Sequence, residues 1–306
     1  MFCLAGLIIF GLLGIFSATH KQLAKDAAHC VFRRATFRKC TIGFKEKFKG
    51  IILSRLINRS ERIARAFNKH FELFSWIFVI LTIVSILWIG KGVYNFYIYG
   101  SCSGLNKSNF CVFDPTGENN KTSLIDETCT IDPPSEASLT ADPLTIEDYP
   151  TKNLNASNKI VFIGCYNCKY TKKSYPIIKE LLEKYSVQFT FIHFPVKTET
   201  DYLTGYGACI YKESQEKFWE FNERLFGAES EKMSDKDFVR GLMHSLGIDD
   251  KKIEECAKDE GLQEKILDQY EDIKQTGIYG TPTIFINGKA FVGPKPTRVY
   301  KRALRK

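Results

Sequence analysis

The sequence predicts an α/β domain with a helical insertion over residues 158–306, preceded by two transmembrane helices. Two uncharged segments of 17 and 18 residues, 2–18 and 73–90, predict the membrane helices, because a helix needs about 20 apolar residues to span a bilayer. Short strand-like runs separated by a largely helical stretch predict the α/β domain. With 44% hydrophobic residues in 306, the chain can form a core, which excludes a disordered or collagen-like protein.

The net charge of +8 is unevenly distributed along the chain. Residues 21–69 hold fourteen Lys and Arg against three acidic residues, whereas residues 92–306 carry a net charge of −3. Because the basic charge is confined to one short loop between the apolar segments, it indicates no nucleic-acid partner. The positive-inside rule instead keeps this loop in the cytoplasm. We therefore predict a multi-pass protein of the cytoplasmic membrane with its C-terminal domain outside.

Each part of the N-terminal region has a predicted role. Residues 1–19 form the first transmembrane helix; the small residues at 17–19 leave a cleavable signal peptide as an alternative, although no Lys or Arg precedes the apolar run. Residues 20–70 form the basic cytoplasmic loop. Apolar residues at near-helical spacing between positions 44 and 63 predict an amphipathic helix on the membrane surface, with a solvated linker as the alternative. Residues 71–93 form the second transmembrane helix.

Residues 94–157 are predicted as an external stalk or linker, because they are rich in Ser, Thr, Asn, Asp and Pro and lack a sustained period. This segment contains three cysteines: Cys102, Cys111 and Cys129. A disulfide between two of them leaves the third unpaired, and spacing alone does not decide which two pair. In the cytoplasmic loop the roles of Cys30 and Cys40 stay open. No metal site is predicted there, because their spacing fits no zinc pattern.

Redox chemistry is predicted from a C-x-x-C motif. Residues 159–163 are a β-branched run typical of a buried strand, Gly164 turns the chain, and a helical pattern follows the motif. A thiolate at the start of a helix has a lowered pKa, because the helix dipole and free N–H groups stabilise its charge. Cys165 is therefore predicted as the exposed nucleophile and Cys168 as the resolving thiol. Half of a zinc site and an inert disulfide are the alternatives, although no second pair of cysteines with this spacing is present.

Further strands and helices are predicted after the motif. Residues 187–195 read as a second strand, and residues 202–275 have an almost wholly helical pattern. A third strand over residues 280–286 ends in Asn287-Gly288, a strong hairpin signal, and a fourth strand follows over residues 289–292. The order of these elements places the helical stretch between the second and third strands.

These pieces together resemble the DsbA-like branch of the thioredoxin superfamily. The matching motifs are Cys165-Tyr166-Asn167-Cys168, His193-Phe194-Pro195, Gln215-Glu216-Lys217-Phe218-Trp219-Glu220-Phe221 and Gly280-Thr281-Pro282-Thr283. The resemblance covers residues 158–306 and implies a thioredoxin-like fold with a helical insertion. It also implies a cis peptide bond between Thr281 and Pro282, in a loop that lies beside the C-x-x-C and pairs with a client strand.

The same resemblance assigns the site. Cys165 and Cys168 form a redox-active pair that needs no dissociable cofactor. The predicted client-binding residues are Thr281, Pro282, Tyr166 and Asn167. A structural disulfide between Cys209 and Cys256 across the helical insertion is implied, with two buried free thiols as the alternative.

The sequence therefore predicts a membrane-tethered thiol–disulfide oxidoreductase that acts on exported proteins with cysteine thiols. By family analogy, its membrane redox partner is a quinone-linked oxidase of the DsbB or vitamin-K-epoxide-reductase type. Two other functions stay open. The same residues suit a reductase or isomerase fed by a membrane electron carrier, and the groove beside Pro282 suits a non-catalytic peptide-binding assembly factor.

Overall fold

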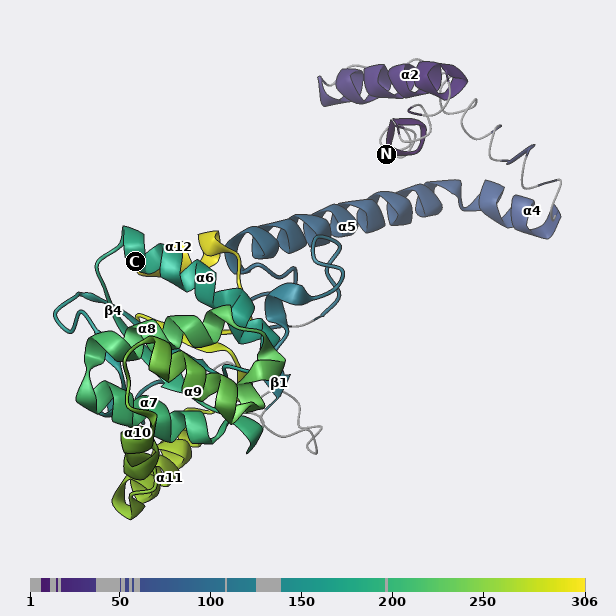
Figure 1. Cartoon of the computed structure of the whole chain (residues 1–306). Coiled ribbons are helices and arrows are strands. Elements are labelled where there is room, and N and C mark those ends of the chain that lie inside the picture. Colours follow the sequence, from purple (N-terminus) through teal and green to yellow (C-terminus); the bar gives the residue numbers. More distant parts are fainter. Residues whose placement is uncertain are drawn as a thin grey trace. The chain divides into compact units, whose positions relative to one another are not determined.

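The computed structural model describes residues 7–11, 15, 18–36, 50, 53–54, 57, 61–107, 109–124, 139–195 and 198–305 (Figure 1). It divides into two compact units, Met1–Lys91 and Gly92–Lys306. The first unit contains α2 (Ala18–Ala35), α4 (Glu61–Lys69) and most of α5 (Phe71–Tyr99). The amphipathic helix predicted between residues 44 and 63 lies largely outside the described residues.

Within the described part of the chain, α5 is the one helix long and apolar enough to span a membrane, over the 27 residues Leu73–Tyr99. Its apolar side chains are exposed along most of its length, with Trp88 80% accessible, as in a helix that faces lipid. The predicted fold class had two transmembrane helices, and the structure supports one. The predicted first helix, residues 1–19, lies mostly outside the described residues.

Helix α5 continues six residues beyond the predicted end at residue 93. No helix-breaking residue stops it until Gly100, whose φ of 76° lies in the left-handed region that glycine tolerates. A Cβ at Gly100 would also lie 2.9 Å from the ring of Pro296. The helix therefore ends where the chain turns against the C-terminal domain.

The second unit is built on a five-stranded sheet (Figure 1). In spatial order its strands are β2 (Thr151–Lys152), β4 (Val187–His193), β3 (Asn158–Gly164), β6 (Thr283–Ile286) and β7 (Lys289–Val292). Strand β3 runs parallel to β4 and antiparallel to β6, whereas β2 and β7 are antiparallel to their neighbours. The predicted strands and hairpin are therefore present, with β3 in the centre of the sheet.

Alternating side chains of β3 build a core on each face of the sheet. Ile160 and Phe162 belong to one hydrophobic cluster, together with residues of α6 (Lys169–Lys184) and α12 (Thr297–Leu304). Val161 and Ile163 belong to a second cluster that includes Ile273. Because both faces are covered, β3 is buried and holds the following turn in a fixed place.

The predicted helical insertion lies between β4 and β6. Its helices are α7 (Tyr202–Glu213), α8 (Gln215–Gly227), α9 (Lys236–Ser245), α10 (Asp250–Ala257) and α11 (Glu260–Gln275). Most begin at a Ser or Asp whose side chain accepts hydrogen bonds from backbone N–H groups of the first turn. A disulfide between Cys209 and Cys256 joins α7 to α10, with the two Cα atoms 6.1 Å apart.

Residues 100–107, 109–124 and 139–157 lie in the predicted stalk and pack against the domain that they precede. Leu139, Leu144 and Tyr149 are buried in the second cluster, and β2 extends the sheet. The Asn106 side chain donates to Ala290 O and accepts from Val292 N, at 3.1 and 2.9 Å, as a strand partner of β7 would. In the part that the structure describes, this segment therefore belongs to the C-terminal domain.

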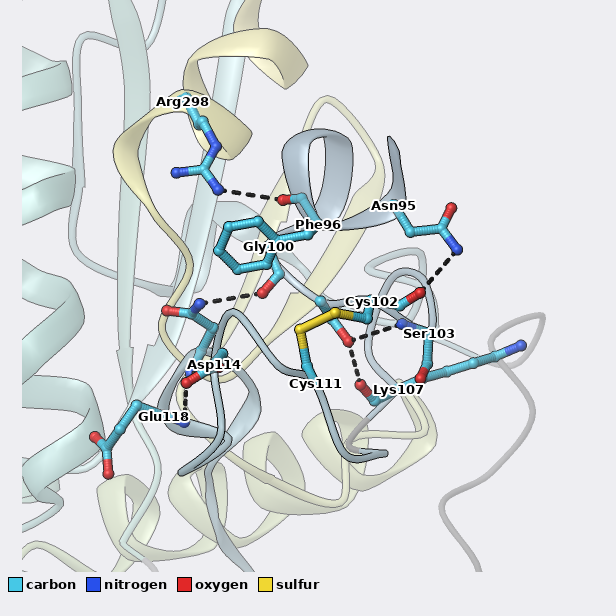
Figure 2. Close-up of a disulfide and its surroundings, with 12 residues drawn as sticks. Asn95, Phe96, Gly100, Cys102, Ser103, Lys107, Cys111, Asp114, Glu118 and Arg298 are labelled. Atoms are coloured by element: carbon cyan, nitrogen blue, oxygen red, sulfur yellow. Dashed lines mark hydrogen bonds between the residues drawn. A yellow bond between two sulfur atoms is a disulfide. The ribbon is translucent and has the colours of Figure 1, made fainter. Parts of the chain in front are cut away.

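A second disulfide fixes the start of this segment (Figure 2). It joins Cys102 and Cys111, a pairing that their spacing in the sequence had left open. Cys129 lies outside the described residues. Asn95 of α5 donates to Cys102 O at 3.1 Å, and Arg298 of α12 donates to Phe96 O at 3.2 Å. The end of α5 is thus bonded to the domain.

Loss of the longer disulfide should destabilise the domain more than loss of the shorter one. The Cys209–Cys256 bridge closes a separation of 47 residues and Cys102–Cys111 one of 9, and the entropy of loop closure predicts stabilisation of about 4 and about 2.5 kcal/mol respectively. We expect Cys209→Ala/Cys256→Ala to lower the free energy of unfolding by the larger amount in guanidinium denaturation. Cys102→Ala/Cys111→Ala is the matched control, and equal losses would contradict the assignment.

Candidate active site

The C-x-x-C motif forms a tight turn between the central strand and a helix. Cys165 follows β3 directly, and Cys168 is the N-cap residue of α6. Cys168 N donates to Cys165 O at 3.1 Å, which closes the turn, and Lys172 N donates to Cys168 O at 3.0 Å. Both cysteines are thiols in the structure. The motif therefore has the predicted context of strand, turn and helix.

Both thiols are buried, which differs from the prediction for Cys165. Cys165, predicted as an exposed nucleophile, is only 1% exposed, and Cys168 is 4% exposed. The Cys165 Sγ lies 3.7 Å from the Thr200 hydroxyl, in the short helix η4 (Thr198–Thr200). A sulfur at this depth becomes accessible to another molecule only after a local change of structure.

Tyr166 lies in the core. Its hydroxyl donates to Asn222 Oδ1 of α8 at 2.8 Å, and its ring stacks on His193 with centroids 4.6 Å apart. Burial raises the pKa of Tyr166 well above its ordinary value and lowers that of His193 to about 3, so both stay neutral. The prediction that Tyr166 contacts the client does not agree with this position. Asn167 is half-buried, so it is the more accessible of the two residues between the cysteines.

The loop before β6 contacts the turn formed by Cys165–Cys168, which we call the redox turn. The Thr281–Pro282 peptide bond is cis, and the Cys168 thiol donates to Thr281 O with 3.4 Å between the heavy atoms. Thr283 Oγ1 donates to Gly280 O at 2.8 Å, and Gly293 N donates to Pro282 O at 2.8 Å. The structure thus brings Cys165, Cys168 and the Thr281–Pro282 loop together.

Lys172 and Thr200 are neighbours of Cys165 that sequence reasoning missed. Burial lowers the pKa of Lys172, while attraction to the Cys165 thiolate opposes that shift, so the ammonium lies within electrostatic range of the sulfur. The same ammonium donates to Leu225 O at 3.0 Å and to Ala228 O. The position of Lys172 one turn into α6 was the available signal, whereas nothing local in the sequence places Thr200.

Within the described part of the chain, no group of three His, Cys, Asp or Glu side chains could hold a metal ion. The chemistry that this site offers is that of two adjacent thiols, a cation and a backbone loop.

A family model described as thioredoxin matches residues 153–306, half of the chain. The thioredoxin-like fold predicted for the C-terminal half is confirmed by this match. The chain is 30% identical over 134 residues to disulfide bond formation protein D of Bacillus subtilis (strain 168), over 41% of this chain and 60% of that protein. It is 24% identical over 147 residues to the probable disulfide bond formation protein D of Bacillus anthracis, over 44% of this chain and 67% of that protein.

Two solved structures are also similar. The thiol-disulfide exchange protein alpha-DsbA2 from Wolbachia pipientis has a TM-score of 0.47 and 22% identity, covering 52% of this chain and 88% of that one. The catalytic domain of Proteus mirabilis ScsC has a TM-score of 0.47 and 21% identity, covering 54% of this chain and 94% of that one.

Removal of the positive charge beside Cys165 should slow its reaction with small electrophiles. Attraction to the Cys165 sulfur is one of the interactions that act on the Lys172 ammonium, so Lys172→Gln, which removes this attraction, should lower the alkylation rate of Cys165 by iodoacetamide at pH 7 roughly threefold. Lys172→Arg keeps the charge and is the control. Mass spectrometry of the Cys165 peptide measures both rates. Equal rates for Lys172→Gln and Lys172→Arg would mean that Lys172 acts only through packing.

Proposed function

Because this chain belongs to the thioredoxin family and is a thiol–disulfide oxidoreductase, we propose that it forms disulfides in exported proteins from a membrane anchor. The observation that carries the proposal is the redox turn at the end of β3. There Cys165 and Cys168 lie at the start of α6, and the Cys168 thiol contacts the carbonyl of Thr281. Disulfide bond formation protein D of Bacillus subtilis, a relative by sequence, supports the proposal by its name.

In the proposed reaction the working form carries a disulfide between Cys165 and Cys168. A client thiolate attacks the Cys165 sulfur, the bond between the two cysteines breaks, and Cys168 leaves as a thiolate. A second client thiolate then attacks the client sulfur of the mixed disulfide and releases Cys165 as a thiolate. The client loses two electrons and gains a disulfide, and the oxidoreductase gains the two electrons.

The spent dithiol must pass its two electrons to another protein before the next cycle. We propose a quinone-linked membrane oxidase of the DsbB or vitamin-K-epoxide-reductase type as that partner, by family analogy. No dissociable cofactor is needed on this chain, because the Cys165–Cys168 pair carries the electrons.

We further propose a multi-pass topology with residues 20–70 in the cytoplasm and the C-terminal domain outside. Residues 21–69 hold fourteen Lys and Arg against three acidic residues, and the positive-inside rule keeps such a loop in the cytoplasm. Helix α5 is then the segment that carries the chain out through the membrane. An exterior location suits the chemistry, because disulfides persist in oxidising compartments.

The roles of the two cysteines can be separated by trapping. In Cys168→Ala the Cys165 thiolate can still attack a disulfide of an exported protein and release one client cysteine as a thiolate. No Cys168 thiol is then present to break the resulting mixed disulfide, so covalent complexes with exported proteins should accumulate. Cys165→Ala should accumulate none. Non-reducing gel electrophoresis of cells after acid quenching measures both. Equal trapping by the two variants would contradict the assignment of Cys165 as the nucleophile and Cys168 as the resolving thiol.

The topology can be tested separately with reporter fusions. A reporter joined at about residue 50 should read cytoplasmic and one joined after Lys306 should read external, because the net charge of +11 over residues 21–69 opposes export of the loop. An external signal at residue 50 would overturn the orientation and the argument for an oxidising compartment.

A further inference from the structure

A short strand of the chain's own N-terminal segment pairs with the loop beside the redox thiols. Strand β1 (Ser123–Leu124) is antiparallel to β5 (Gly280–Thr281), with Ser123 opposite Thr281 and Leu124 opposite Gly280. These two strands form a sheet of their own, apart from the five-stranded sheet. The paired residues are 158 and 156 positions apart in the sequence, so this pairing is a long-range contact of the domain.

The residues just before β1 are held by a buried lysine. Lys295 is 1% exposed, and its ammonium donates to Asn119 O at 2.9 Å and to Asn120 Oδ1. Because burying a cation is costly unless it finds acceptors, these two bonds fix residues 119 and 120 against the domain.

A glycine and an ion pair strengthen this hold. A Cβ at Gly293 would lie 2.8 Å from the backbone of Asn120 and Lys121, so the two backbones touch. Lys173 of α6 pairs with Glu118 at 2.9 Å. Gly293 also donates to Pro282 O, so the segment is fastened to the loop that contains β5.

The edge that β1 occupies lies next to the dithiol. Thr281 accepts a hydrogen bond from the Cys168 thiol through its carbonyl and pairs with Ser123 along its strand. An extended polypeptide can add to a strand edge through main-chain hydrogen bonds, and an edge beside Thr281 would align such a polypeptide with the redox sulfurs. In the same structure Cys165 and Cys168 are 1% and 4% exposed.

The family resemblance implies that an extended client pairs with the loop that contains β5, and we propose that β1 is the resident occupant of this edge. The resting domain is thereby occluded by its own segment, and the extended client must displace Ser123–Leu124 before its cysteine reaches Cys165. This proposal rests on the proposed oxidoreductase function and concerns the access of clients to that site. The partner it selects is a flexible, unfolded segment that can replace a strand, in preference to a folded surface.

The test breaks the pairing of β1 and leaves the site intact. Proline lacks the N–H that a strand donates, so Ser123→Pro/Leu124→Pro should release β1 from β5. With the full-length reduced protein in detergent, we expect Cys165 to react with iodoacetamide at least ~10-fold faster, since loss of ~1.4 kcal/mol of closure is a factor of ten. Asn109→Pro, at an exposed bend of the same segment, is the matched control and should keep the wild-type rate. Equal rates in the double variant and the control would overturn the proposal.

A milder variant decides the matter if the double-proline chain does not fold. Asn120→Ala removes one acceptor of the Lys295 ammonium without touching either strand. It should raise the alkylation rate of Cys165 in the same direction, by roughly threefold. A wild-type rate in this variant would then overturn the proposal.

Turnover of a peptide client distinguishes a β1 strand that blocks the docking edge from one that only supports β5. We expect the Ser123→Pro/Leu124→Pro variant to oxidise a synthetic dithiol peptide with a lower KM than the wild-type protein, because its docking edge is already vacant. A fall in turnover of this peptide with faster alkylation would mean that β1 supports β5, and would overturn the proposal. The alkylation rate needs no turnover, so failure of the oxidoreductase function would appear in the peptide assay alone.

Discussion

The close approach of Gly164 to Thr171 determines where the redox thiols lie. A Cβ at Gly164 would clash with the Thr171 methyl group, so only glycine allows β3 to end in contact with the first turn of α6. Thr171 is fully buried, and its hydroxyl accepts from Cys165 N at 3.4 Å. The strand and the helix are each anchored in the core, so the turn between them has little freedom. The positions of both sulfurs follow from this contact.

The surroundings of the turn combine neutral buried groups with one cation. His193 Nδ1 and Thr204 Oγ1 are 2.9 Å apart, and Thr204 Oγ1 and Tyr270 OH are 2.7 Å apart. Burial raises the pKa of Tyr270 to about 12 and keeps His193 neutral, so this network carries no charge at neutral pH. Strand β3 contains no Asp or Glu. Lys172 is a charged group beside this network: burial lowers its pKa, and attraction to Cys165 and to Glu231 opposes that shift.

Local patterns were enough to predict the sheet and the redox turn, and the family resemblance was enough to imply the Cys209–Cys256 bridge. These features depend on residues close together in sequence or on whole motifs. The direction of Tyr166 was not predictable in this way, because it depends on Asn222 and His193 from other elements. The packing of residues 100–107, 109–124 and 139–157 was missed for a related reason. Their composition is that of a loop, and single contacts such as Asn106 with β7 fasten them to the domain.

The hold on residues 118–121 also limits what release of β1 can change. Lys295 and Gly293 contact Asn119, Asn120 and Lys121, and we expect these contacts to persist when Ser123 and Leu124 are released. A strand fastened two residues from its docking edge has a high effective concentration at that edge, so it rebinds quickly after each opening. An extended client therefore competes with an intramolecular strand rather than with solvent. Discrimination among clients then comes from the length and continuity of the client strand. Strand β1 pairs through only two residues, so a longer client strand can form more main-chain hydrogen bonds with the same edge.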